Sequence, residues 1–104
     1  MSADGFSFLA GTEVLGSAHA GWTFDQTGDG SERSFRRYVA FQRSFHYQPL
    51  VHLGIAGFDI ANEDAARLTV AAANVTPEGF EIVLSTWLHS RLWRVDVNWL
   101  ALGA

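Results

Sequence analysis

A two-residue period near the end of this 104-residue chain constrains its fold more than any other feature. In the stretch LWRVDVNWL, one set of alternate positions holds Trp93, Val95, Val97 and Trp99. The other set holds Leu92, Arg94, Asp96 and Asn98. Because successive side chains of a β-strand point to opposite faces of a sheet, this period predicts a half-buried strand.

Similar patterns predict four more strands, in SFRRYVAF (34–41), PLVHLGI (49–55), residues 67–74 and GFEIVLSTW (79–87). A short first strand is predicted in AGWTF (20–24). The alanine-rich stretch NEDAARLTVAAA also suits a helix, but the alternation from Leu68 to Ala72 favours a strand. The connecting segments are polar or contain glycine or proline. Six short strands with such turns predict one all-β domain over residues 1–104, a sandwich or a barrel.

The charge balance argues against a nucleic-acid-binding domain. The net charge is −4, with no basic stripe of the kind such a domain needs. Only 17% of the residues are charged, below the usual quarter or so, while 13% are aromatic. This combination favours a surface partly covered by further copies of the chain. The alternative is a monomer with a neutral surface rich in serine, threonine and glycine.

Cysteine usage and hydropathy indicate which covalent, metal-binding and membrane features the chain can have. There is no cysteine, so neither a disulfide framework nor a thiolate metal site is expected, and the redox compartment stays open. The first residues lack the basic segment and apolar run of a signal peptide. The apolar runs are too short for a membrane span, so no membrane insertion is expected.

Three stretches follow one another over residues 39–103: FQRSFHYQPLVHLGIAGFDI, ARLTVAAANVTPEGFEIVLSTW and WRVDVNWLALG. In these stretches and their order, the second half of the chain resembles the H-type lectin domain, the family of snail agglutinins and of the C-terminal domain of slime-mould discoidins. The resemblance implies a six-stranded antiparallel β-sandwich. It also implies a homotrimer of parallel subunits, with sites for galactose-type sugars, above all N-acetylgalactosamine, at the subunit interfaces.

Sugars need directional hydrogen bonds and an aromatic ring that stacks on their apolar face. The resemblance assigns hydrogen bonding to Arg67, which opens a predicted strand, and stacking to Trp87. It assigns an aromatic position at the start of the last strand to Trp93. Two of these residues also have a structural alternative: Arg67 as a cap of a strand end or a partner of Glu63 or Asp64, and Trp87 as a half-buried interface aromatic.

The sequence departs from the family pattern after Trp87. A histidine that contacts the sugar is expected there, but the position holds Leu88, and the histidine follows as His89. A shift of one residue on a strand moves a side chain to the other face. Either the turn is rearranged, or this hydrogen bond is missing and the specificity differs. A trimeric structural or attachment module with a decayed sugar site is therefore the alternative function.

An aspartate from an early loop completes the family's site across the interface, and Asp29 in the sequence GDG is the candidate. Its flanking glycines permit close approach of a sugar, although a turn aspartate in a solvated loop is the alternative. His52 is predicted to leave the core face, so three copies could meet on a trimer axis. No cofactor, metal site or catalytic group is expected, because neither metal-ligand spacing nor a nucleophile motif occurs. The predicted partners are glycans or glycoconjugates.

Overall fold

The computed structural model describes residues 2–3, 5–26 and 28–104 and contains only β-strands and connecting segments there. The strands are β1 (Ser2–Ala3), β2 (Phe6–Gly16), β3 (Gly30–Ala40), β4 (Leu50–Ile60), β5 (Thr69–Thr76), β6 (Gly79–Leu88) and β7 (Leu92–Gly103). Six long strands, together with the two-residue β1, form two antiparallel sheets in the orders β1-β2-β7-β4 and β3-β6-β5. The predicted six-stranded antiparallel β-sandwich is confirmed. No helix in the described part of the chain is long and apolar enough to cross a membrane.

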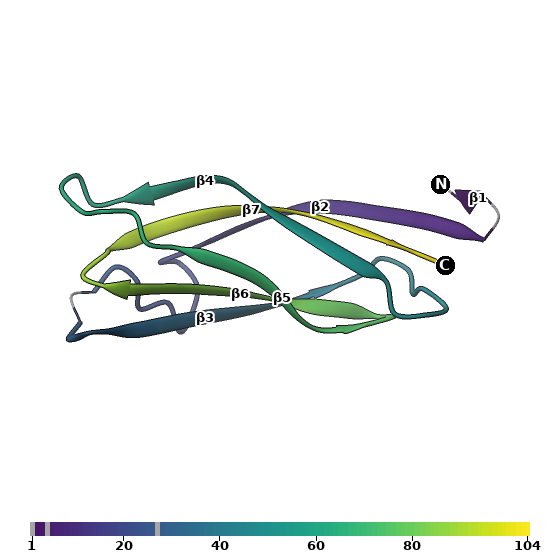
Figure 1. Cartoon of the computed structure of the whole chain (residues 1–104), viewed down its shortest axis with the longest axis horizontal. Coiled ribbons are helices and arrows are strands. Elements are labelled where there is room, and N and C mark those ends of the chain that lie inside the picture. Colours follow the sequence, from purple (N-terminus) through teal and green to yellow (C-terminus); the bar gives the residue numbers. More distant parts are fainter. Residues whose placement is uncertain (1, 4, 27) are drawn as a thin grey trace.

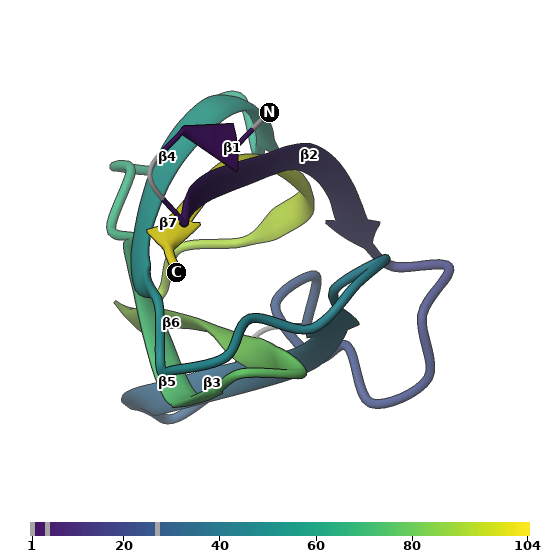
Figure 2. The ribbon, with the colours of Figure 1, turned by 90° about the vertical axis from the view of Figure 1, so that its right-hand side faces the viewer.

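The two sheets face one another across an elongated molecule of 50 × 20 × 20 Å (Figures 1 and 2). Three connections meet at the left in Figure 1: β2 to β3, β4 to β5, and β6 to β7. We call this end the loop end. Both chain termini and the β3–β4 and β5–β6 connections lie at the other end, here named the terminal end.

The core lies between the sheets and follows the predicted alternation. The first sheet contributes Leu15, Leu92, Val95, Val97 and Ala101, and the second contributes Phe35, Val39, Phe80, Ile82 and Leu84. Aromatic side chains from the connections close both ends of this core. Trp22 and Phe24 pack near Phe35 at the loop end.

The predicted first strand at residues 20–24 is wrong. The first long strand is β2, and Trp22 lies in the connection between β2 and β3. Trp22 and Phe24 are both buried, so they have the burial period of a strand. They are held by single contacts to the start of β7: the Trp22 indole donates to the Leu92 carbonyl at 2.9 Å, and the Leu92 amide donates to the Phe24 carbonyl at 2.8 Å.

The alternation predicted for the last strand holds from Val95 onwards and fails at its start. Asp59 lies opposite Arg94, but the next residue of β4, Ile60, lies opposite Leu92, so Trp93 is skipped. A bulge of this kind turns the following side chains to the other face. Leu92 is therefore fully buried, whereas Trp93 is 38% exposed.

Candidate functional site

The end of β6 carries Trp87 and Leu88 to the loop end. The buried Thr86 points into the core, so strand alternation places Trp87 on the outer face of the β3-β6-β5 sheet, where it is half-buried. The Thr86 hydroxyl donates to the carbonyl of Arg67 at 2.5 Å. This bond ties the segment just before β5 to the end of β6, one residue before Trp87.

Leu88 breaks the strand geometry. Its φ of 56° lies in the left-handed region, which costs an L-residue about 1–2 kcal/mol, and its side chain is 46% exposed. The alternation of β6 therefore does not decide where His89 points. Both side chains lie near Gly30, because a Cβ added there would be 3.8 Å from the His89 ring and 4.0 Å from Leu88. The turn thus departs from plain strand geometry at Leu88.

Asp29 lies beside this turn in the same chain, because Gly30 pairs with Leu88 in the sheet. One oxygen of the Asp29 carboxylate accepts hydrogen bonds from the Ser31 hydroxyl at 2.6 Å and from the Ser31 amide at 2.9 Å. These bonds, the hydroxyl first, hold the pKa of Asp29 below its ordinary value. The residue is exposed, so its second oxygen can accept hydrogen bonds from a ligand.

Arg67 lies against the β6–β7 turn, residues 89–91. Its Nη1 donates to the Ser90 hydroxyl at 3.2 Å, and that hydroxyl donates to the Ala65 carbonyl at 2.5 Å. The predicted alternative partner Asp64 instead bonds Arg91, through the Arg91 amide at 2.9 Å and its side chain at 3.1 and 3.3 Å. The Arg91 side-chain bond is the main cause of a lowered pKa at Asp64.

Arg33 organises the site and was missed by sequence reasoning. Its Nη1 donates to the Gln26 carbonyl at 2.8 Å, and its Nη2 donates to the Ser90 carbonyl at 2.7 Å and the Leu88 carbonyl at 3.4 Å. It therefore fastens the β2–β3 connection to the β6–β7 turn. The sequence offers no local signal for this role, because the Leu88 and Ser90 partners are 55 and 57 residues away.

The predicted residues accordingly fall into two groups. Four predicted residues lie in the β6–β7 turn or beside it, namely Asp29, Arg67, Leu88 and His89. Trp87 lies next to Leu88 on the outer face of the β3-β6-β5 sheet. Trp93 lies apart, in a hollow of about 240 Å³ lined by Val14, Gly16, Ser17, Ala18, His19 and Arg94. His52 of β4 lies on the exposed face of the β1-β2-β7-β4 sheet, opposite Leu100.

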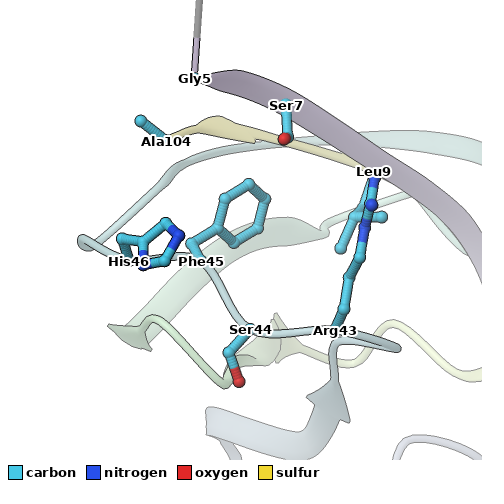
Figure 3. Close-up of a pocket in the computed structure, with 8 residues that line it drawn as sticks. All are labelled: Gly5, Ser7, Leu9, Arg43, Ser44, Phe45, His46 and Ala104. Atoms are coloured by element: carbon cyan, nitrogen blue, oxygen red, sulfur yellow. The ribbon is translucent and has the colours of Figure 1, made fainter. Parts of the chain in front are cut away.

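A slightly larger hollow, of about 260 Å³, lies at the terminal end and contains none of the predicted residues. Figure 3 shows Arg43, Phe45 and His46 along one side of it, below Ser7 of β2. We base the site on the β6–β7 turn instead, because polar groups from three connections converge there. Size alone does not identify a binding site.

The arrangement at the turn suits recognition by hydrogen bonds better than bond-breaking chemistry. It combines a guanidinium, an exposed carboxylate, an imidazole and an indole ring. The Ser90 hydroxyl is buried and already bonded to Ala65 and Arg67. In the described part of the chain, no three His, Asp or Glu side chains are grouped closely enough to hold a metal ion.

Comparison with known proteins relates this geometry to a family and a fold. The family model of the H-type lectin domain matches residues 36–102. A protein of Fuscovulum blasticum named "ATP synthase subunits region ORF 7" is 36% identical over 94 residues, covering 90% of this chain and 81% of that protein. Its name does not describe an activity.

Two solved structures share the fold. Wild-type discoidin II from Dictyostelium discoideum superposes with a TM-score of 0.79 at 22% identity, over 99% of this chain. The chain spans 38% of the length of that discoidin II chain. An N-truncated R1-type pyocin tail fibre superposes with a TM-score of 0.57 at 18% identity, covering 95% of this chain and 71% of that one.

Proposed function

Because the chain belongs to the H-type lectin domain family, we propose that it is a non-enzymatic, carbohydrate-binding protein that recognises galactose-type glycans as a homotrimer. Carbohydrate binding in general is what membership of this family supports. The identity of the sugar, the trimer and the site residues are our proposal. The observation that carries it is that Asp29, just before β3, and Arg67, just before β5, flank the end of β6 from its two sides.

The two charged groups suit the hydroxyls of a sugar. Arg67 uses one nitrogen on Ser90, so its remaining N–H groups can donate to a ligand. Asp29 uses one oxygen on Ser31 and leaves the other to accept. Hydrogen bonds that involve an ionised group are stronger than neutral ones, so the pair would fix the orientation of the hydroxyls.

The half-buried Trp87 beside this pair would cover the apolar face of the sugar. We place Trp93 in a secondary role, because it opens into the separate hollow beside Val14 and His19. A shallow site of this kind binds weakly, and a symmetric trimer raises the effective affinity by binding several sugars at once. Asp29 of one copy would then reach the site of its neighbour or complete its own.

Leu88 favours the second candidate, a trimeric structural or attachment module whose sugar site has decayed. An exposed apolar side chain stands where the imidazole of a sugar-binding histidine would be expected. In the lectin, Leu88 would relax or change the preference for N-acetylgalactosamine, while His89 supplies the nearest imidazole.

Calorimetry with N-acetylgalactosamine and galactose separates these functions. We expect wild type to bind at least one of the two sugars. Arg67→Ala should weaken binding roughly ten- to a hundredfold, as the loss of one charged hydrogen bond predicts. Leu88→His should raise the affinity for N-acetylgalactosamine. Arg36→Ala is the matched control, because Arg36 is exposed on β3 and pairs with the partly exposed Glu81 at 3.2 Å.

Equal binding by wild type and a folded Arg67→Ala would refute the assigned site. Absence of binding by wild type to both of these sugars, and across a broad glycan array, would favour the attachment module. Turnover of a glycoside during the titration would contradict a non-enzymatic function.

A further inference from the structure

The hollow at the terminal end, here called the terminal hollow, lies where the inward row of β2 begins. Strand alternation points Ser7 and Leu9 into the sandwich, because their neighbours Phe6 and Phe8 are exposed. The small Ser7 side chain leaves the end of the core open between β2 and the β3–β4 connection. The volume of about 260 Å³ is below the roughly 300–1,000 Å³ of pockets for drug-sized ligands, so it suits a ligand the size of one sugar residue.

The β3–β4 connection, which forms the lower wall of the terminal hollow, is held in place without a ligand. The Phe45 amide donates to the Pro77 carbonyl at 2.9 Å. The amides of His46 and Tyr47 both donate to the carbonyl oxygen of Ala104, at 2.9 and 3.1 Å. Because this wall is already ordered, a ligand would lose little affinity to the ordering of a loop.

The side chains that line the terminal hollow are rich in hydrogen-bond donors. The Arg43 guanidinium has five N–H donors and no acceptor, Ser7 contributes a hydroxyl and His46 an imidazole. None of the lining side chains is acidic. Within the described residues, no side-chain hydrogen bond or ion pair engages these three groups. A ligand that supplies acceptors and negative charge therefore complements this surface.

Figure 3 shows how these groups are arranged. The Arg43 side chain extends from the β3–β4 connection towards β2, so that its guanidinium lies near Leu9. The Phe45 ring stands on the other side of the space below Ser7, whereas the Ser44 hydroxyl points away from that space. A guanidinium binds a carboxylate through two parallel hydrogen bonds, and aromatic and aliphatic side chains cover C–H groups.

We propose that the terminal hollow binds an acidic sugar residue, with the carboxylate on Arg43 and the C–H groups of the ring against Phe45 and Leu9. A neutral sugar would leave the guanidinium without an ionic partner, and a small inorganic anion would leave the apolar wall uncovered. The terminal hollow and the β6–β7 turn lie at opposite ends of a molecule 50 Å long. This site is therefore separate from the galactose-type site of the proposed function and does not rest on it.

Amide NMR spectra of the intact chain, titrated with sodium glucuronate at constant ionic strength, test this site. We expect saturable shifts that concentrate on Ser7 and on residues 43–46. Glucose has the same ring without the carboxylate, so it should bind at least about tenfold more weakly. Sodium acetate has the carboxylate without the ring, so it should also bind more weakly than glucuronate.

Replacing Arg43 tests the assigned contact. Arg43→Gln should weaken glucuronate binding roughly ten- to a hundredfold, because the charged hydrogen bonds are lost. Arg43→Lys should recover only part of the affinity, because an ammonium is a point charge and not a planar fork. Arg37→Gln is the matched control, because Arg37 is an exposed arginine of β3 that does not line the terminal hollow. Arg43 is exposed, so the dispersed amide spectrum should persist in its variants.

Absence of saturable shifts with glucuronate would overturn this inference, and so would equal affinity for glucose or acetate. Equal binding of glucuronate by wild type and Arg43→Gln would overturn it as well. Shifts that concentrate on the β6–β7 turn and disappear in Arg67→Ala would assign the acid to the turn instead. None of these results decides the proposed function, because calorimetry with galactose and N-acetylgalactosamine measures that binding separately.

Discussion

Replacing Arg33 with alanine should destabilise the fold much more than replacing its neighbour Arg36 on the same strand. The Arg33 guanidinium donates at 2.8 Å to the carbonyl of Gln26 and at 2.7 Å to that of Ser90. It thereby joins the β2–β3 connection to the β6–β7 turn, next to the bonds that Trp22 and Phe24 make with Leu92. The exposed side chain of Arg36 contacts Glu81 at 3.2 Å.

The magnitude follows from where each bond lies. The bond to Ser90 is partly buried, and a hydrogen bond from a charged group contributes about 1.5–3 kcal/mol in such a setting. The bond to Gln26 is exposed and adds about 0.5–1 kcal/mol. We therefore expect Arg33→Ala to lower the free energy of unfolding by about 2–4 kcal/mol. Arg36→Ala should cost about 0–1 kcal/mol, as exposed ion pairs do.

Urea unfolding at one fixed protein concentration measures this difference. With a slope of about 1–3 kcal/mol per molar urea, Arg33→Ala should shift the midpoint down by about 1–3 M. Arg33→Lys should recover only part of the loss, because an ammonium cannot span both carbonyls as the planar guanidinium does. If Arg33→Ala and Arg36→Ala unfold at the same midpoint, Arg33 does not fasten the loop end.

Three further predictions concern other parts of the fold. Gly11→Ala should lower the free energy of unfolding by about 1–3 kcal/mol and lower the melting temperature, because the added Cβ would lie 2.7 Å from the Trp99 indole nitrogen. An unchanged melting curve would contradict this packing. Asp64→Asn should flatten the loss of stability in acid. The hydrogen bond from Arg91 depresses the folded pKa of Asp64 below its ordinary 3.8, so its contribution is present above that value and is lost as the pH falls through the folded pKa. Equal acid unfolding curves for both proteins would exclude this role. Thr86→Val should lower the free energy of unfolding by about 1–3 kcal/mol, because the Arg67 carbonyl loses its donor. Calorimetry should also show weaker sugar binding. A variant as stable as wild type would show that water replaces the hydroxyl.

The residue pattern alone was sufficient to predict an all-β domain and most of its core, while the choice of a sandwich over a barrel came from the family resemblance. Val95 and Val97 alternate with polar residues, and both are fully buried, because the side-chain period of a strand equals the period of the sequence. The same reasoning missed β2. Its outward positions include the apolar Phe8, and its inward row includes Glu13 opposite Val97, so its alternation of polarity is weak.

Family resemblance identified candidate site residues, but only the tertiary structure decided how they are arranged. Trp22 and Phe24 are buried at alternate positions, as in a strand, yet both belong to a connection. Burial depends on what packs against a side chain and not on backbone pairing alone. A bulge exposed Trp93 and separated it from the other candidates, and no pattern in the sequence announces a one-residue shift in register.

The role of Arg33 and the bend at Leu88 also lay beyond the sequence. Arg33 bonds the Ser90 carbonyl 57 residues away as well as the nearby Gln26, and Leu88 adopts a left-handed backbone although leucine does not favour it. The sequence by itself determined the period of every main strand except β2, and through it most of the faces that meet in the core, because that signal is local. The site depends on contacts between connections that are distant in the chain, and these exist only once the two sheets have packed.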